Sequence, residues 1–387
     1  MARMLSSKRS ASQTRSAPSY SKKIRYAVVG LGHIAQAAVL PAFANARKNS
    51  ELVGLVSGDE EKLKKLGRKY KTTWNVAYES FEDLLKSGDI DAVYIALPNN
   101  LHRDYAVRAA EAGVHILCEK PLAVTSTECD EIIRAARQNR VKLMVAYRLH
   151  FEEANLKAIE IAQSGKLGEA RMFGSLFSFQ VKDDENIRLQ ANKGGGPLYD
   201  IGIYCINAAR YLFRSEPEEV FAYTSNSKDP RFSEVEEMSG ALLKFSNDRI
   251  ASFVVSFGAA DTSFYEIVGT EGSLRVENAY EYAEEITHRL AIGHKIKKKT
   301  FSKKDQFAAE LLYFSHCVAH DMEPEPDGLE GLADVRIIEA LHESARIHQP
   351  VRLPPLDKET RPGLDQEIDR PAHGEPEEVK ARSPHAN

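Results

Sequence analysis

Residues 24–35, IRYAVVGLGHIA, join an apolar, β-branched run to the spacing Gly30-x-Gly32-x-x-Ala35. The run predicts a buried strand, the following residues predict a helix, and residues 51–57 predict a second strand. In such a unit the first glycine permits a tight turn and the second lets a pyrophosphate approach the backbone, while a small third residue lets the helix pack on the strand. The residues predicted to contact the phosphates of a dinucleotide are Gly30, Gly32, His33 and Ile34.

The end of the second strand selects between the two nicotinamide dinucleotides. An acidic residue at this position binds the ribose 2′-hydroxyl of NAD and repels the 2′-phosphate of NADP. Here Ser57 and Gly58 end the strand and Lys62 follows on the next helix, and this combination suits a phosphate. Asp59 and Glu60 leave NAD as an alternative, since either carboxylate can swing back to a ribose. We therefore expect NADP to be preferred over NAD.

The remainder of the first 146 residues alternates between apolar strands and helical segments. This alternation predicts an α/β domain at residues 24–146 with a doubly wound parallel sheet. Ligands of such sheets bind at the carboxyl ends of the strands. The strands are expected at 91–98, 114–118 and 142–147, and the helices at 81–86, 103–112 and 126–139. The strand-end residues predicted to contact the cofactor are Leu97, Pro98, Asn99, His102, Glu119 and Lys120.

From Ala170 the pattern changes to long segments rich in aromatic and β-branched residues, without helices of similar length between them. This pattern predicts a second, α+β domain at residues 147–353 with a large, open, mostly antiparallel sheet. The basic run at 295–299 is interpreted as a solvated strand edge, because lysines discourage edge-to-edge pairing. We expect the second domain to bind substrate and to form the oligomer contact.

Bulk composition restricts the class of protein. A chain of 387 residues is long enough for two domains, and its net charge of −4 gives no indication of nucleic-acid binding. No apolar run approaches the roughly 18 residues of a membrane span. The four cysteines form no CxxC or Cys/His pair, so we expect reduced thiols and no metal site.

The two ends differ from the middle. Residues 1–23 are basic and serine-rich, without an acidic residue and without the apolar stretch of a secretory signal. They are interpreted as a disordered arm, and a cytoplasmic location is expected. Residues 354–387 are polar and contain several prolines, so they are also predicted to be disordered.

Two further stretches carry ionisable groups in unusual places. In HILCEKPLA (115–123) a lysine, Lys120, stands at the mouth of a buried strand. In GGGPLYDIGIYCINAARYLF (194–213) a glycine turn leads into a helix on which Asp200 and Tyr204, at spacing i, i+4, share one face. The simpler alternative for this helix is an ordinary amphipathic helix with a tyrosine hydroxyl at its edge.

Taken together and in order, six motifs resemble the glucose–fructose oxidoreductase and inositol dehydrogenase (Gfo/Idh/MocA) family of nucleotide-dependent sugar oxidoreductases, and most closely its glucose–fructose and aldose oxidoreductase branch. The resemblance covers about residues 24–353. The motifs are VGLGHIAQ, SGDEEK, LPNNLH, CEKPLA, VAYRLHFEEAN and GGGPLYDIGIYCINAARYL. Most members of the family carry histidine where this chain has Tyr204.

The resemblance implies that Lys120, Asp200 and Tyr204 are the catalytic residues and also contact the substrate. It also implies a cis Lys120–Pro121 bond and a homodimer or homotetramer formed through the open sheets. Oxidation of a sugar hydroxyl requires a group that removes the hydroxyl proton, and the Tyr204 phenol beside the Lys120 ammonium is suited to this task. The basic residues expected to contact the sugar or the nicotinamide are Arg148, His150 and Arg188.

Three functions are compatible with these residues. The first is an NADP-dependent oxidoreductase that acts on a pyranose or a related polyol or ketose. The second is a closed-cycle enzyme that oxidises one sugar and reduces another with tightly bound NADP. The third is a regulator that senses NADP without catalysis, and the presence of all three proton-transfer residues argues against it.

Overall fold

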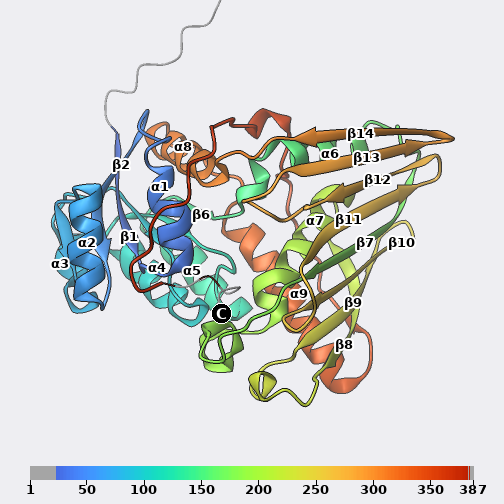
Figure 1. The fold of residues 1–387 in the computed structure, drawn as a ribbon, viewed down its shortest axis with the longest axis horizontal. Coiled ribbons are helices and arrows are strands. Elements are labelled where there is room, and N and C mark those ends of the chain that lie inside the picture. The colour runs from blue at the N-terminus through green and yellow to red at the C-terminus, as the bar shows by residue number, and fades with distance from the viewer. Residues whose placement is uncertain (1–22, 382, 384–387) are drawn as a thin grey trace, which may run out of the picture.

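The computed structural model describes residues 23–381 and 383, which form two lobes, each built on one β-sheet (Figure 1). Except for Lys23, the basic arm expected at residues 1–23 lies outside the described residues. Within the described part of the chain, no helix is long and apolar enough to span a bilayer.

The sheet of the first lobe contains six parallel strands among the described residues, in the order β3-β2-β1-β4-β5-β6. The strand order reverses between β1 and β4, which is the arrangement of a doubly wound nucleotide-binding sheet. The predicted α/β fold of this lobe is thereby confirmed. The strands are β1 (Ile24–Val29), β2 (Ser50–Val56), β3 (Trp74–Val76), β4 (Ala92–Ile95), β5 (His115–Cys118) and β6 (Leu143–Val145).

Both faces of this sheet are buried, because successive side chains of a strand point to opposite faces. In β1, Ala27 and Val29 belong to one apolar cluster, whereas Tyr26 and Val28 belong to the other. A π-helical turn, Ala35–Val39, follows the first strand and continues into α1. The helices between the strands are α1 (Leu40–Ala42), α2 (Glu60–Tyr70), α3 (Phe81–Lys86), α4 (His102–Glu111) and α5 (Ser126–Gln138).

The second lobe holds a nine-stranded sheet in the described residues, in the order β14-β13-β12-β11-β7-β10-β9-β8-β15. Its neighbouring strands are antiparallel except for the β7–β10 pair. The predicted open, mostly antiparallel sheet is confirmed, and the basic run at 295–299 lies in its edge strand β14. The strands are β7 (Ala170–Ser178), β8 (Pro217–Ser225), β9 (Met238–Phe245), β10 (Arg249–Ser256), β11 (Thr262–Gly269), β12 (Gly272–Glu277), β13 (Ile286–Ile292), β14 (Lys295–Phe301) and β15 (Val351–Arg352).

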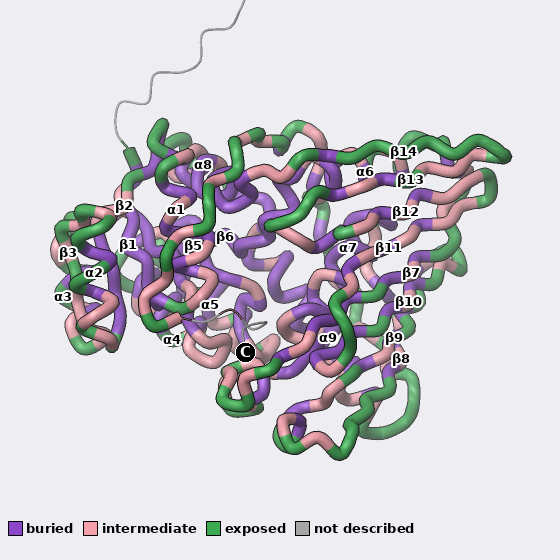
Figure 2. The backbone as a smooth tube through the Cα atoms, in the orientation of Figure 1, coloured by how far each residue is buried: buried purple, intermediate pink, exposed green. Residues whose placement is uncertain are grey.

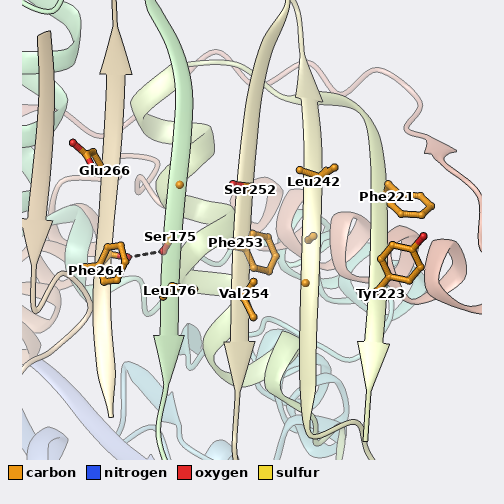
Figure 3. A pocket seen from close by; sticks show the side chains of 13 residues that line it. Ser175, Leu176, Phe221, Tyr223, Leu242, Ser252, Phe253, Val254, Phe264 and Glu266 are labelled. Carbon is orange, nitrogen blue, oxygen red and sulfur yellow. Dashed lines mark hydrogen bonds between the residues drawn. The ribbon is translucent and has the colours of Figure 1, made fainter. Parts of the chain in front are cut away.

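Helices cover one face of the large sheet and leave the other face open (Figures 1 and 2). The helices of this half of the chain are α6 (Glu153–Gln163), α7 (Ile203–Phe213), α8 (Gln306–Ala319) and α9 (Gly328–Ile347). On the open face, Leu176, Leu242 and Val254 project side by side from neighbouring strands (Figure 3) and are 38%, 50% and 38% exposed.

Helix α8 does not pack with the sheet that precedes it in the chain. It returns to the first lobe, where Phe307 and Leu311 join the apolar cluster of Tyr26 and Val28. The Tyr26 hydroxyl and the Ser315 hydroxyl lie 2.7 Å apart. Thus a segment that the sequence places within 147–353 completes the packing of the first lobe.

The predicted disorder of residues 354–387 is wrong for the part of this tail that the structure describes. The Lys358 ammonium lies 3.2 Å from the buried Glu330 carboxylate, and Arg361 pairs with Glu216 at 2.5 Å. Both acids also bind Arg210, which is fully buried. The tail is held by buried opposite charges rather than by an apolar core of its own. It then runs back along the first lobe past α1 (Figure 1).

Candidate active site

A cavity of about 780 Å³ lies between the lobes, at the carboxyl ends of the parallel strands. Residues of both sheets line it, as expected for a site that binds a dinucleotide in the first lobe and a substrate against the second. The predicted residues that line this cavity are Gly30, Gly32, His33, Ile34, Ser57, Lys62, Leu97, Pro98, Asn99, Glu119, Lys120, Arg148, Arg188, Asp200 and Tyr204.

The glycine turn has the geometry that a bound pyrophosphate requires. Gly30 has φ of +95°, and a Cβ there would lie 2.4 Å from the carbonyl oxygen of Ala96. Only glycine fits this position. At Gly32, by contrast, a Cβ would meet no atom within 4 Å, so the backbone faces open space. The turn therefore offers room for a phosphate to approach the main chain, and these residues fit a dinucleotide.

The ribose end of the cavity is formed by residues after β2. Ser57 and Lys62 line the cavity, whereas Asp59 is turned onto its own helix. One Asp59 carboxylate oxygen accepts the backbone N–H groups of Glu61 and Lys62, at 2.9 and 3.1 Å, and so caps α2. The Asp59 carboxylate, one of the two alternative ribose ligands expected from the sequence, is therefore engaged in capping this helix.

Lys120 belongs to a row of hydrogen-bonded charged side chains that joins the two lobes. Its ammonium donates to the carbonyl oxygen of Asp200 at 2.7 Å and to the carboxylate of Asp200 at 3.1 Å. The other oxygen of this carboxylate accepts from Arg188 at 2.6 Å. The Lys120–Pro121 peptide is cis, as the family resemblance implied.

The charges in this row support one another. Burial disfavours the Lys120 ammonium, but Tyr204, Asp200 and Glu119 outweigh this effect and raise the pKa of Lys120 above its ordinary value. Burial likewise opposes the Asp200 carboxylate, yet Arg188 and Lys120 lower its pKa well below the ordinary range. These neighbours therefore favour the charged form of Lys120.

Tyr204 is positioned by two cations. The Lys120 ammonium lies 4.8 Å from the centre of its ring, and the Arg148 guanidinium lies 5.1 Å from it. Arg148 also donates an N–H to the Tyr204 hydroxyl oxygen at 3.3 Å. Arg148 is itself held by Gln306 and by the carbonyl oxygen of Tyr280. The phenol proton thus remains available for the cavity, because the guanidinium is a donor only.

The helix that carries Asp200 and Tyr204 begins irregularly. Leu198–Gly202 is a π-helical turn that continues into α7. Asp200 therefore lies in the π-helical turn, whereas Tyr204 lies in the first turn of the regular helix. Single π-helical turns occur frequently at functional sites because they redirect side chains. Here both side chains line the same cavity.

Three predicted site residues do not reach the cavity and require correction. His102 is buried, with its ring nitrogens 2.8 and 2.9 Å from the carbonyl oxygens of Pro121 and Leu97, so it braces two strand ends. His150 is buried between Glu325 and Asn207. Gly58 packs against the ring of Tyr78. Each of these residues contacts other protein groups instead of the cavity.

Many residues that line the cavity were not predicted, and six of them are aromatic. Four of the aromatic residues come from the end of β7 and from the loop after β12, where the run NAYEYAEE gave the only signal, a pair of tyrosines among acids. For Ser383 the sequence carries no signal at all. The six aromatic residues are Tyr78, Phe177, Phe179, Tyr280, Tyr282 and Phe307.

Comparison with known proteins yields matches over both lobes. Residues 24–147 match an oxidoreductase family with an NAD-binding Rossmann fold, and residues 155–275 match the GFO/IDH/MocA C-terminal domain. A D-xylose 1-dehydrogenase [NADP(+)] of Haloarcula marismortui is 33% identical over 338 residues, which cover 85% of this chain and 93% of that protein.

Solved structures show the same architecture. The crystal structure of an aldose-aldose oxidoreductase from Caulobacter crescentus, complexed with glycerol, is similar with a TM-score of 0.82 and 37% identity, and the match covers 86% of this chain and 100% of that chain. A 3-ketoreductase from Actinomadura kijaniata, in complex with NADP and TDP-benzene, has a TM-score of 0.77 and 27% identity over 84% of this chain and 98% of that chain.

Proposed function

Because this chain belongs to the GFO/IDH/MocA family of oxidoreductases, we propose that it transfers a hydride between NADP and a pyranose or a related polyol or ketose. The similarity to a xylose dehydrogenase and to an aldose-aldose oxidoreductase supports a sugar as the substrate. The observation that carries the proposal is the convergence of Lys120, Asp200 and Tyr204 on the cavity that also contains the glycine turn.

The roles of the side chains follow from their charges. When bound, the nicotinamide accepts the hydride from the sugar or returns it. Tyr204 takes the hydroxyl proton in the oxidative direction and gives it back in the reductive direction. The Arg148 N–H donated to its oxygen stabilises the negative charge that develops there when the proton is absent. Lys120, fixed by Asp200, orients the sugar oxygen toward the phenol.

A panel of sugars tests this function. Purified protein is incubated with NADP⁺ or NAD⁺ and with aldoses, ketoses and polyols, and reduced nicotinamide is followed by its absorbance. Oxidation of at least one sugar supports the proposal, and inactivity with every sugar and both cofactors favours the NADP-sensing regulator.

The closed-cycle alternative is separated by a second measurement on the same preparation. The protein is denatured and any released nucleotide is identified. Release of one NADP per chain supports a cycle in which one sugar is oxidised and another is reduced without cofactor exchange. An empty preparation that turns over added NADP⁺ supports a dehydrogenase.

Cofactor preference is expected to depend on Ser57. Ser57→Asp places a carboxylate at the carboxyl end of β2, where it repels a 2′-phosphate and accepts hydrogen bonds from a ribose diol. We expect the affinity for NADP⁺ to fall about tenfold or more and the affinity for NAD⁺ to rise, because unit charges a few ångströms apart interact strongly at partly buried sites. Fluorescence titration of both dinucleotides measures these changes.

Ser57→Asn is the matched control, because it has nearly the size of aspartate without the charge. It should bind NADP⁺ more tightly than Ser57→Asp does. Equal NADP⁺ affinities for the aspartate variant and the unmodified protein would show that the selecting residue lies elsewhere.

We also propose that the chain forms a homodimer or homotetramer through the open face of the nine-stranded sheet. The exposed Leu176, Leu242 and Val254 of Figure 3 support this contact. The double variant Leu242→Glu/Val254→Glu is expected to sediment as a monomer at micromolar concentration, because two carboxylates per protomer would be buried without partners. Met322→Glu, at an apolar residue that is 45% exposed outside the sheet, is the control and should leave assembly unchanged. A monomeric unmodified protein would contradict this proposal.

A further inference from the structure

The end of the described tail lies along the cofactor half of the cavity. The Val379 N–H donates to the side-chain oxygen of Gln36 at 2.7 Å, and the Gln36 amide donates to the carbonyl oxygen of Val379 at 2.9 Å. The Glu378 carboxylate lies 2.9 Å from Nδ1 of His33, in the glycine turn itself. Ser383 lines the cavity. Residues 375–381 therefore follow the phosphate-binding turn and the helical segment after it.

Within this segment, Lys380 does not line the cavity itself but pairs with two acids that flank its lining residues Ser57 and Lys62. Its ammonium lies 3.3 Å from an oxygen of Asp59 and 2.9 Å from an oxygen of Glu61. These two acids follow β2, where a carboxylate normally selects NAD and repels NADP. Lys380 therefore supplies the positive charge that compensates them.

The cation of Lys380 acts together with that of Lys62. Lys62 lines the cavity, and its pKa is lowered, first by burial and further by the charge of Lys380, although Asp59 and Glu378 oppose this shift. An anion bound near both ammonium groups would favour their charged forms. A ribose 2′-phosphate is the anion that a dinucleotide brings to this end of the cavity.

We propose that residues 375–381 belong to the cofactor site and that Lys380 is a specificity-determining residue for NADP. Lys380 compensates Asp59 and Glu61, so that Ser57 and Lys62 can receive the 2′-phosphate without repulsion from these acids. The same segment spans the glycine turn and slows release of the bound dinucleotide. This inference rests on the proposed function and extends it by a residue more than 300 positions away from the glycine turn.

The test compares dinucleotide binding by full-length protein and two variants, Lys380→Gln and Lys380→Glu. Titrations with NADP⁺ and NAD⁺ give both dissociation constants. For Lys380→Gln we expect NADP⁺ affinity to fall about two- to fivefold, a change consistent with an exposed ion pair, and for Lys380→Glu we expect a larger fall. Affinity for NAD⁺ should change less than about twofold, since NAD lacks the phosphate, and the difference should shrink at high salt.

Lys304→Gln is the matched control. Lys304 pairs with Asp369 of the same tail at 2.8 Å, whereas Lys380 pairs with the two acids after β2. Replacement of Lys304 should leave both dissociation constants unchanged. A chain that ends at Gly374 should lose at least as much NADP⁺ affinity as Lys380→Glu and should release NADP⁺ faster in stopped-flow displacement.

The outcomes separate the two proposals. An unmodified protein that binds NAD⁺ more tightly than NADP⁺ overturns the proposed NADP preference. A ratio of NADP⁺ to NAD⁺ affinity that is the same in the unmodified protein and in Lys380→Glu overturns the role of Lys380, whichever cofactor is preferred. A ratio that shifts toward NAD⁺ in Lys380→Glu, and not in Lys304→Gln, supports it.

Discussion

Lys120→Ala is expected to lower kcat/KM for sugar oxidation by about 10²–10⁴-fold or more, the range for loss of a positioned proton-transfer system. The substitution removes the cation that lies 4.8 Å from the centre of the Tyr204 ring. It also removes the hydrogen bond from the Lys120 ammonium, in the first lobe, to the Asp200 carboxylate. Steady-state rates with the best sugar of the panel measure the loss.

A folding defect does not explain such a loss if the variant keeps its dinucleotide affinity and its melting temperature. Asp200 would still be paired with Arg188 in the variant, so no buried carboxylate would be left alone. A Lys120→Ala protein with near-normal turnover would remove Lys120 from the mechanism.

Tyr204→Phe is expected to lower kcat by about 10²–10⁴-fold while sugar KM and NADP⁺ affinity change little. The phenylalanine keeps the ring that packs on Phe177 and Tyr280, and it removes only the oxygen to which Arg148 donates. The pH profile of the oxidative reaction provides a second readout, since the limb that reports the proton acceptor should disappear or shift.

Tyr265→Phe is the control for deletion of a tyrosine hydroxyl. Tyr265 is buried in the second lobe and does not line the cavity, so its removal should spare the pH profile. The double variant Lys120→Ala/Tyr204→Phe should lose less than the product of the two single losses, because the two groups act as one unit. Near-normal turnover of Tyr204→Phe would mean that the proton passes through Lys120, Asp200 or a water, and that Tyr204 only packs at the edge of its helix.

The first lobe was predictable because its signals are local. The spacing of Gly30, Gly32 and Ala35 reports a backbone geometry that few other residues permit, and polar residues such as Ser57 and Lys120 stand out directly after apolar strands. A parallel sheet brings all strand ends to one edge, so such residues meet without any knowledge of the loops.

The errors arose where contacts that exist only in the folded chain decide what a side chain faces. Periodicity does not reveal whether a histidine at a strand end faces a cavity or, like His102, binds two carbonyl oxygens. The tail has too few apolar residues for a core of its own, and nothing near Lys358 in the sequence indicates that it pairs with the buried carboxylate of Glu330. The cavity tyrosines after β12 were missed for the same reason, because only the fold brings them opposite the glycine turn.

The return of helix α8 to the first lobe has a consequence for synthesis on the ribosome. The first sheet is complete in the chain at Val145, but the helix that covers Tyr26 and Val28 begins only at Gln306. At translation rates of about 5–20 residues per second, this interval lasts roughly 10–30 s. During that time the face that holds Tyr26 and Val28 is covered by the segment after β1 but lacks α8, so the uncovered part is open to chaperones or to aggregation. Folding of the first lobe therefore cannot finish before most of the second lobe has been translated.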